Sequence, residues 1–269
     1  MRIFSLFLLF PIVLSATDLR PWYRNDLEPH PYVAWNPQIY DKLDTKHGCV
    51  NRDERAHFVT LGVDGSYEKW AAELEVILAD TLDHDFGFDH ARLTGRYQWW
   101  SDDIGDAFSL VTGITLIQAV TESVHDLSSF HHSKFEGEGH IAIGQQCFSE
   151  QFWTSRWWGD LALGLSDQGS PWMRGNIGFE RNYWDWYQWQ LFARSLWGFG
   201  GRDLDLDPDH NFHGYGDIQH RSVDLGGRLA YWKDCLGEIS CEYAYRVYAK
   251  NFPKHVHQFR LQILYPFGL

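Results

Sequence analysis

The chain lacks several features that would place it in common classes of protein. After residue 14 no apolar run approaches the roughly 20 residues that a transmembrane helix needs. Basic residues are outnumbered: 23 Lys and Arg against 36 Asp and Glu give a formal net charge of -13. This charge argues against nucleic acid as a partner. If the mature chain lies in a membrane, it must do so as a closed β-barrel, because only helices and closed barrels satisfy their backbone groups in lipid.

Residues 1–16 have the pattern of a secretory signal peptide. A basic start at Arg2 precedes an apolar run from Ile3 to Leu14, and Ser15 and Ala16 offer small side chains for cleavage. Export leads to an oxidising compartment in which disulfides can form. No CxxC or Cys/His zinc spacing is present, and three disulfide pairings are possible among Cys49, Cys147, Cys235 and Cys241.

Alternation of apolar and polar residues with a period of two dominates the second half of the chain and recurs in the first half. In residues 92–99, for example, Leu93 and Tyr97 share one face while Arg92 and Arg96 share the other. Such alternation predicts strands with one face on an apolar medium and the other on a polar interior. About twelve segments of this kind occur, and their centres lie near residues 34, 61, 75, 94, 113, 142, 161, 176, 192, 226, 244 and 263.

The connections between these segments alternate between short and long. Residues 66–69, 101–106, 182–185 and 233–237 are short turns, and residues 81–87, 121–136, 200–219 and 251–256 are generally longer. The short connection at residues 166–171 is an exception. Short turns on one side and long loops on the other are the layout of outer-membrane barrels, in which both termini face the periplasm when the strand number is even.

The final segment carries the most specific signal. It places apolar side chains at every second position to the end of the chain: Phe259, Leu261, Ile263, Tyr265, Phe267 and Leu269. This pattern resembles the terminal strand of bacterial outer-membrane β-barrel proteins, although their last residue is usually Phe. The resemblance implies location in the bacterial outer membrane, contact with outer-membrane lipids and lipopolysaccharide, and recognition by the barrel-assembly machinery.

The predicted fold is therefore all-β, a transmembrane antiparallel up-and-down β-barrel of about twelve strands. We assign the barrel to residues 53–269. Residues 17–52 form an N-terminal lead that contains a possible first strand or a partial plug, because Pro21, Pro29, Pro31 and Pro37 disfavour regular structure there. Paired tryptophans near strand ends, such as Trp99-Trp100, Trp157-Trp158 and Trp172, are typical of interfacial girdles. The alternative fold is a secreted soluble β-sandwich lectin with exposed Trp.

Charged residues at the polar positions are expected to face the lumen, where they either fill it as ion pairs or line an open pore. Arginine outnumbers acid among them, so a conducting lumen should favour anions. The predicted lumen-facing residues are Arg92, Arg96, Arg156, Asp160, Arg174, Glu180, Arg194, Asp224, Arg228, Glu242, Arg246 and Arg260.

Two further groups of residues suggest chemistry in the long loops. Clustered carboxylates suit calcium, and carboxylate with imidazole suits zinc or copper; the candidate ligands, otherwise simply solvated loop residues, are Asp203, Asp205, Asp207, Asp209 and His210. Apart from this divalent cation no cofactor is expected. A His-x-Ser pair, His131 and Ser133, is similar to the arrangement in outer-membrane phospholipase and lipid A deacylases, and strand parity would place it on the lipid side.

The sequence thus leaves several functions open. It favours a non-catalytic surface protein or a narrow porin for small solutes, because the lumen is arginine-rich and no complete active site is evident. The alternatives are an outer-membrane lipid hydrolase that uses His131 and Ser133, and the soluble lectin.

Overall fold

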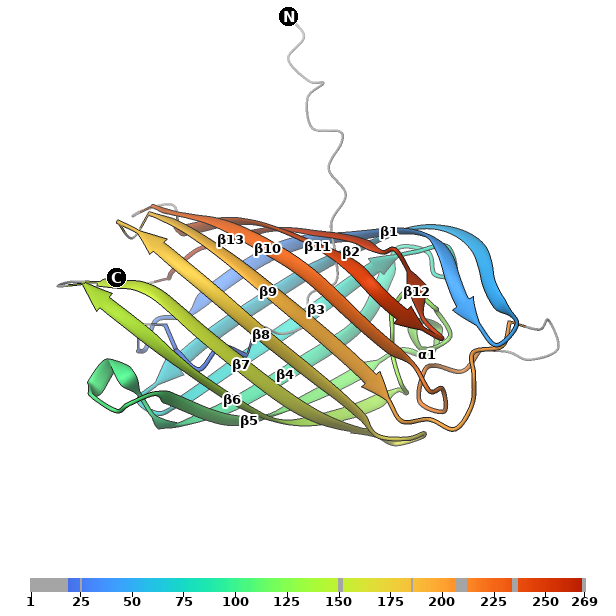
Figure 1. The fold of residues 1–269 in the computed structure, drawn as a ribbon, viewed down its shortest axis with the longest axis horizontal. Coiled ribbons are helices and arrows are strands. Elements are labelled where there is room, and N and C mark those ends of the chain that lie inside the picture. Colours follow the sequence, from blue (N-terminus) through green and yellow to red (C-terminus); the bar gives the residue numbers. More distant parts are fainter. Residues whose placement is uncertain are drawn as a thin grey trace, which may run out of the picture.

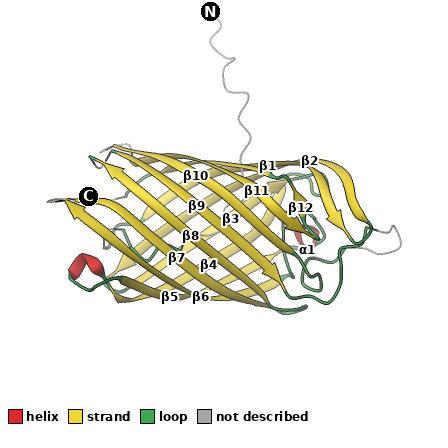
Figure 2. Cartoon of the chain, viewed as in Figure 1, coloured by secondary structure: helices red, strands yellow, loops and turns green. Residues whose placement is uncertain are grey.

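The computed structural model describes residues 19–24, 26–149, 152–184, 186–206, 212–233 and 237–267. Twelve long antiparallel strands wind around a single axis (Figures 1 and 2). The strands are β1 (His30–Thr45), β2 (Gly48–Tyr67), β3 (Trp70–Asp80), β4 (Gly87–Trp100), β5 (Ser109–Ala119), β6 (Phe135–Ser149), β7 (Phe152–Ser166), β8 (Trp172–Tyr183), β9 (Tyr187–Gly198), β10 (Arg221–Lys233), β11 (Gly237–Lys250) and β13 (His257–Leu264). A two-residue strand β12 (Pro253–Lys254), a 3-10 turn η1 (Asp102–Ile104) and one helical turn α1 (Thr121–Val124) complete the elements.

The first and last strands close the sheet into a barrel. Val33 of β1 pairs with Leu61 of β2 on one side and with Ile263 of β13 on the other. Closure removes the open edges that a two-sheet sandwich would keep, which confirms the predicted barrel and excludes the lectin alternative. Among the described residues, no helix is long and apolar enough to cross a membrane.

The barrel begins at His30, upstream of the boundary set at residue 53 from the sequence. Prolines had argued against regular structure in this region, but β1 accommodates them. Pairing of β1 with β13 stops at Trp35 and resumes at Gln38, and the gap includes Pro37, which has no N–H to donate. The predicted signal peptide of residues 1–16 and the terminal Leu269 lie outside the described residues, so these expectations remain predictions.

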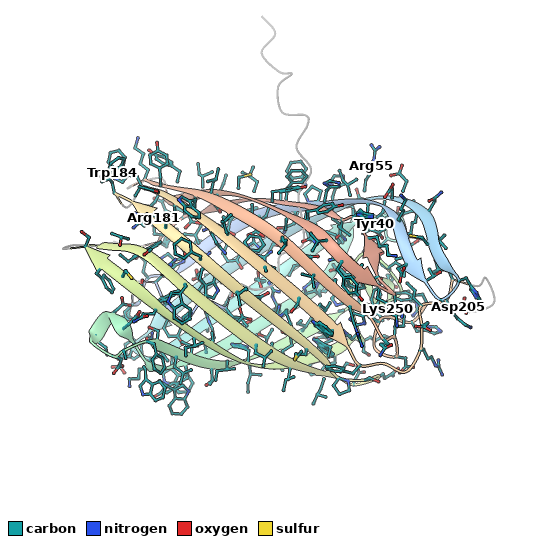
Figure 3. All side chains as sticks on the ribbon, in the orientation of Figure 1. Tyr40, Arg55, Arg181, Trp184, Asp205 and Lys250 are labelled. Carbon is teal, nitrogen blue, oxygen red and sulfur yellow. The ribbon has the colours of Figure 1, made fainter. Side chains whose placement is uncertain are left out.

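Burial alternates along the strands as the sequence pattern predicts. In β6, Ile141 and Ile143 are 46% and 39% exposed on the outer face, whereas Ala142 is 1% exposed inside. Figure 3 shows side chains projecting outward all around the wall, among them Arg55 and Trp184. In the described part of the chain, Cys49, Cys147 and Cys241 are exposed and unpaired.

The two ends of the barrel differ in their connections. One end, the short-turn end, carries the connections from β2 to β3, β4 to β5, β6 to β7, β8 to β9 and β10 to β11, and the described termini lie there too. The other end, the long-loop end, carries residues 120–134, the described parts of 199–220 (199–206 and 212–220) and residues 251–256. Which end faces the periplasm remains a prediction from the sequence.

Aromatic side chains gather on the outer face near the short-turn end. Trp70, Tyr97 and Trp99 form a contiguous group with ring centroids 4.7 and 4.8 Å apart. Two of the tryptophans assigned to a girdle from sequence lie inside instead. Trp158 and Trp172 are 3% and 1% exposed, because both occupy inward-facing positions of β7 and β8.

Candidate pore and its two closures

A polar cavity of about 760 Å³ occupies the lumen at the short-turn end. Eight arginines contribute to its lining: Arg20, Arg24, Arg92, Arg96, Arg156, Arg194, Arg228 and Arg260. Five carboxylates face them: Asp64, Glu73, Glu75, Glu238 and Glu242. Guanidinium groups thus outnumber carboxylates by three, and we call this space the arginine chamber.

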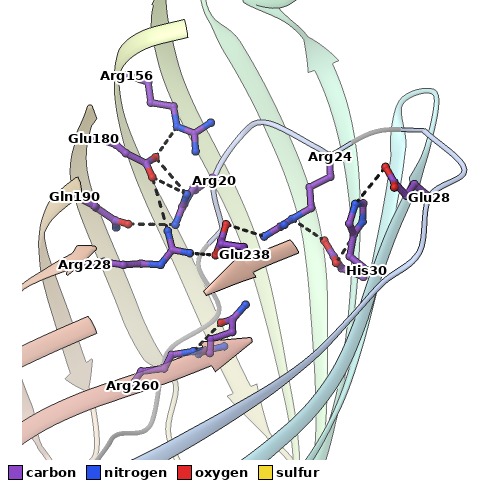
Figure 4. A network of polar contacts seen from close by, with 12 residues as sticks. Arg20, Arg24, Glu28, His30, Arg156, Glu180, Gln190, Arg228, Glu238 and Arg260 are labelled. Carbon is purple, nitrogen blue, oxygen red and sulfur yellow. Dashed lines mark hydrogen bonds and ion pairs between the residues drawn. The ribbon is translucent and has the colours of Figure 1, made fainter. Parts of the chain in front are cut away.

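The start of the N-terminal lead lies inside the chamber, where an ion-pair network holds it against the wall (Figure 4). Arg20 Nη1 lies 3.1 Å from Glu180 Oε1, and Arg156 Nε donates to Glu180 Oε2 at 2.6 Å. Arg228 lies 3.9 Å from the same carboxylate and also bonds Glu238. Glu180 is fully buried, so three arginines share one desolvated carboxylate.

Two more residues of the lead bind the wall. Trp22 Nε1 donates to Asp102 Oδ1 at 2.8 Å, and its ring meets Trp158 edge-on. Arg24 lies 3.5 Å from Asp64. Residues 19–24 therefore form an inward segment that narrows the lumen at the short-turn end, one of the roles that the sequence left open for the lead.

Not every arginine in the chamber forms an ion pair. In the part of the chain that the structure describes, neither Arg96 nor Arg260 forms an ion pair. Arg96 donates weakly to the carbonyl of Arg20 at 3.4 Å, and its buried Nε has no hydrogen-bond partner. Arg260 donates to Gln262 at 2.9 Å. These two guanidinium groups leave positive charge facing the cavity.

The residues predicted to face the lumen all lie inside the wall. Arg92, Arg96, Arg156, Arg194, Arg228, Glu242 and Arg260 line the arginine chamber, Arg174, Asp224 and Arg246 line a second cavity, and Glu180 and Asp160 are buried. Sequence reasoning missed Arg20, Arg24, Glu73, Glu75 and Glu238. The alternation of Glu73 and Glu75 with Leu74 in β3 could have revealed two of them.

The long-loop end is closed by an apolar cluster rather than by charge. Residues 120–134, 251–256 and the described parts of 199–220 fold inward and pack together; we call them the loop plug. Phe252 is 1% exposed, with its ring 4.7 Å from Phe130 and 4.9 Å from Tyr215. The buried apolar cluster contains five residues of the plug, Leu127, Leu204, Tyr215, Ile218 and Phe252, together with Leu43 of β1 and Ala249 of β11. A cavity of about 180 Å³ lies beside the plug, lined in part by Phe130, His131 and Phe252.

Polar contacts fix the first loop of the plug. Asp126 accepts hydrogen bonds from the backbone N–H of Ser128 and the hydroxyl of Ser129, both at 2.8 Å. Gln38 of β1 donates to the carbonyl of Ser128 at 2.8 Å. Burial raises the pKa of Asp126 to about 6. The loop is therefore tied to the wall by neutral donors and holds a carboxyl group that titrates unusually high.

The predicted catalytic pair does not face lipid. His131 and Ser133 are 4% and 5% exposed. The nitrogens of His131 face Asp89 and Glu136 at 3.4 Å, and the backbone N–H of Ser133 donates to Glu136 at 3.4 Å. The expectation was wrong because β6 begins at Phe135. Strand parity does not extend into the preceding loop, which folds into the barrel. The structure thus offers no support for lipid hydrolysis by this pair.

Two of the predicted metal ligands have protein partners. Asp203 Oδ1 accepts a hydrogen bond from Asn251 at 2.7 Å, and Asp205 lies 3.3 Å from Lys46 Nζ. The other candidates, Asp207, Asp209 and His210, lie outside the described residues. A cation at this loop therefore remains a prediction.

Comparison with known proteins bears on the fold. No protein-family model matches the sequence, and no curated protein sequence matches it. The solved COG4313 outer membrane channel from Pseudomonas putida F1 is similar over 94% of this chain and 98% of that chain, with a TM-score of 0.64 and 10% identity. The chain has the fold of bacterial outer-membrane channels. A NanC porin structure is similar over 90% of this chain and all of its own, with a TM-score of 0.56 and 9% identity.

Proposed function

We propose that this protein is an outer-membrane channel whose narrow lumen passes small anionic solutes. The observation that carries the proposal is the arginine chamber inside a closed barrel. Its eight guanidinium groups face five lining carboxylates and the buried Glu180, an excess of two positive charges. Charge that faces a confined, low-dielectric passage attracts ions of opposite sign and repels like ions. The fold shared with a solved outer-membrane channel and a porin supports the same function.

The second candidate function is a non-conducting surface protein. The apolar core of the loop plug favours it, because a buried aromatic cluster at one end of the lumen opposes ion flow. The two functions differ in one measurable property, unitary conductance in a planar lipid bilayer.

The decisive experiment measures current and reversal potential for the purified protein across a salt gradient. The channel predicts discrete conductance steps and a reversal potential that shows anion preference. Arg96→Gln combined with Arg260→Gln should lower that preference, because this change removes two positive charges that line the cavity and form no ion pair with the described residues there. Arg181→Gln is the matched control, since Arg181 is exposed on the outer face (Figure 3).

Two results would contradict the channel. The first is absence of unitary steps in the native protein and also in a variant with a shortened plug. The second is conductance whose ion preference is unchanged by the Arg96/Arg260 double variant.

A further inference from the structure

A buried cluster of metal-binding side chains lies where the loop plug meets the barrel wall. Asp89 and His90 stand near the start of β4, and His131 comes from the plug. Asp89 Oδ2 lies 2.7 Å from His90 Nδ1 and 3.4 Å from His131 Nε2. One donor atom from each residue lies within 4.8 Å of the other two. All three side chains are at most 5% exposed.

A β-bulge explains why two consecutive strand residues both point inward. Ile77 of β3 pairs with His90, and the next residue, Leu78, pairs with Phe88. Asp89 is therefore the extra residue, which re-aims its own side chain into the barrel beside that of His90. Regular pleating would have sent one of the two to the outer face.

A second carboxylate orients the histidine of the plug. Glu136 Oε1 lies 3.4 Å from His131 Nδ1, so it can accept the Nδ1–H and leave Nε2, which lies 3.4 Å from Asp89 Oδ2, to ligate a metal ion once its proton is displaced. Glu136 is itself held by the backbone N–H of His132 at 2.7 Å. A carboxylate behind a ligating imidazole is the usual outer-shell arrangement at zinc sites.

Asp89 also has an unused oxygen. The residue is fully buried, yet its Oδ1 has no hydrogen-bond partner. A buried carboxylate oxygen without a partner is uncommon and is explained by a bound ion or an ordered water. Two imidazole nitrogens and one carboxylate form a donor set that zinc accepts with a water in the fourth position, whereas calcium and magnesium prefer oxygen ligands.

We propose that Asp89, His90 and His131 bind a divalent transition metal ion of the zinc class, which fastens the loop plug to the barrel wall. The proposed site does not depend on the channel proposal. Its ligands come from the wall and from the plug, and they can hold a metal ion whether or not the lumen conducts.

The test is zinc binding by the full-length protein in detergent after treatment with a chelator, measured by calorimetry. Cobalt absorption reports the coordination geometry independently. We expect one zinc ion per chain and a four-coordinate cobalt spectrum. Glu136→Gln should weaken binding by about 10–100-fold, the range seen for outer-shell partners. His131→Ala and the nearly isosteric Asp89→Asn, which remove ligands, should each weaken it more than Glu136→Gln does. Zinc should also slow hydrogen exchange in residues 120–134.

The matched control is His125→Ala. His125 Nε2 lies 3.2 Å from His213 Nδ1 in an exposed pair at the same end of the barrel, which offers a competing surface site. Binding that survives His125→Ala and is lost in Asp89→Asn supports the proposal. Binding lost in His125→Ala but kept in Asp89→Asn would overturn it, as would no stoichiometric binding at micromolar zinc. If His131→Ala fails to fold, Asp89→Asn with the cobalt spectrum decides.

Discussion

The two ends of this barrel are closed by different kinds of interaction. At the short-turn end, residues 19–24 enter the lumen and are held by ion pairs, above all those of Glu180. At the long-loop end, three loops bring their own apolar core, centred on Phe252. The first closure depends on charges fixed in the strands, and the second on burial of aromatic surface. Each should therefore respond to a different class of perturbation.

The largest expected effect is on conductance when the loop plug is shortened. Residues 120–134 can be replaced by a short Gly-Ser turn, because Gln118 and Phe135 already pair across β5 and β6. This change removes Leu127 and Phe130 from the plug, so unitary conductance should rise several-fold. A Leu82→Ser/Phe86→Ser variant, which alters exposed side chains of another loop at the same end, should conduct like the native protein. Equal conductance in all three proteins would show that the plug does not limit flow.

The charged closure should be most sensitive at Glu180. Glu180→Gln keeps the shape of the side chain but leaves Arg20, Arg156 and Arg228 without their shared carboxylate. Removing one partner of a buried ion pair typically costs about 3–5 kcal/mol. Denaturant unfolding in lipid should reveal that loss, and protease should cut the lead faster. Glu68→Gln, an exposed carboxylate at the same end, should change stability by less than about 0.5 kcal/mol. Similar stabilities for the two variants would argue against the network as the anchor of the lead.

The apolar closure should be most sensitive at Phe252. Truncation of a buried Phe to Ala costs about 3–5 kcal/mol, but the plug can open without unfolding the barrel. We therefore expect faster hydrogen exchange in residues 120–134 and more frequent channel opening, with barrel stability changed less. Phe199→Ala removes an exposed ring at the same end (52% exposed) and should leave exchange unaltered. Protection of the loop that persists in Phe252→Ala would contradict an apolar core for the plug.

The same contrast explains what could be predicted from sequence. Alternation with a period of two identified all twelve long strands and the inward arginines, because a strand that separates two media must repeat every second residue. This rule depends only on neighbouring residues, so it can be applied to the sequence without knowledge of the tertiary structure. It failed at His131 and Ser133, which lie in a loop. It also could not have placed Asp89 inside the barrel, because a β-bulge breaks the alternation there.

The closures themselves depend on contacts between distant segments. Arg20 lies 160 residues from Glu180, and Phe130 packs on Phe252 from another loop. No spacing in the chain links these partners, so the sequence could predict an arginine-rich lumen without predicting what blocks it. The prolines of β1 misled for a related reason. A proline destabilises a strand only where the neighbouring strand would accept a hydrogen bond from the missing N–H. The register of β1 with β13 shows that no such bond is needed at Pro37, and the sequence alone does not give this register.

The smallest expected effect is a change in the stability of the loop plug with pH, which the closure at the short-turn end should not share. Asp126 is buried in the plug near Asp83, Tyr40 and Tyr215, and burial raises its pKa to about 6, above the unfolded value of about 3.9. The folded loop therefore binds the proton more tightly than the unfolded loop. The stabilisation is complete below about pH 4 and is lost as the pH rises to about 6, by at most about 3 kcal/mol for two pKa units.

Hydrogen exchange of residues 120–134 between pH 4 and 7, corrected for intrinsic rates, measures this loss. Asp126→Asn keeps one oxygen that accepts from the Ser128 N–H, places an NH2 that can donate to the Ser129 hydroxyl, and cannot ionise. Its loop should therefore stay equally protected across that range. The lead should not share the Asp126 transition, because its contacts at Glu180 and Asp102 lie at the opposite end of the barrel. A transition of equal size in the native protein and in Asp126→Asn would assign the pH response to another group and remove Asp126 from the account of the plug.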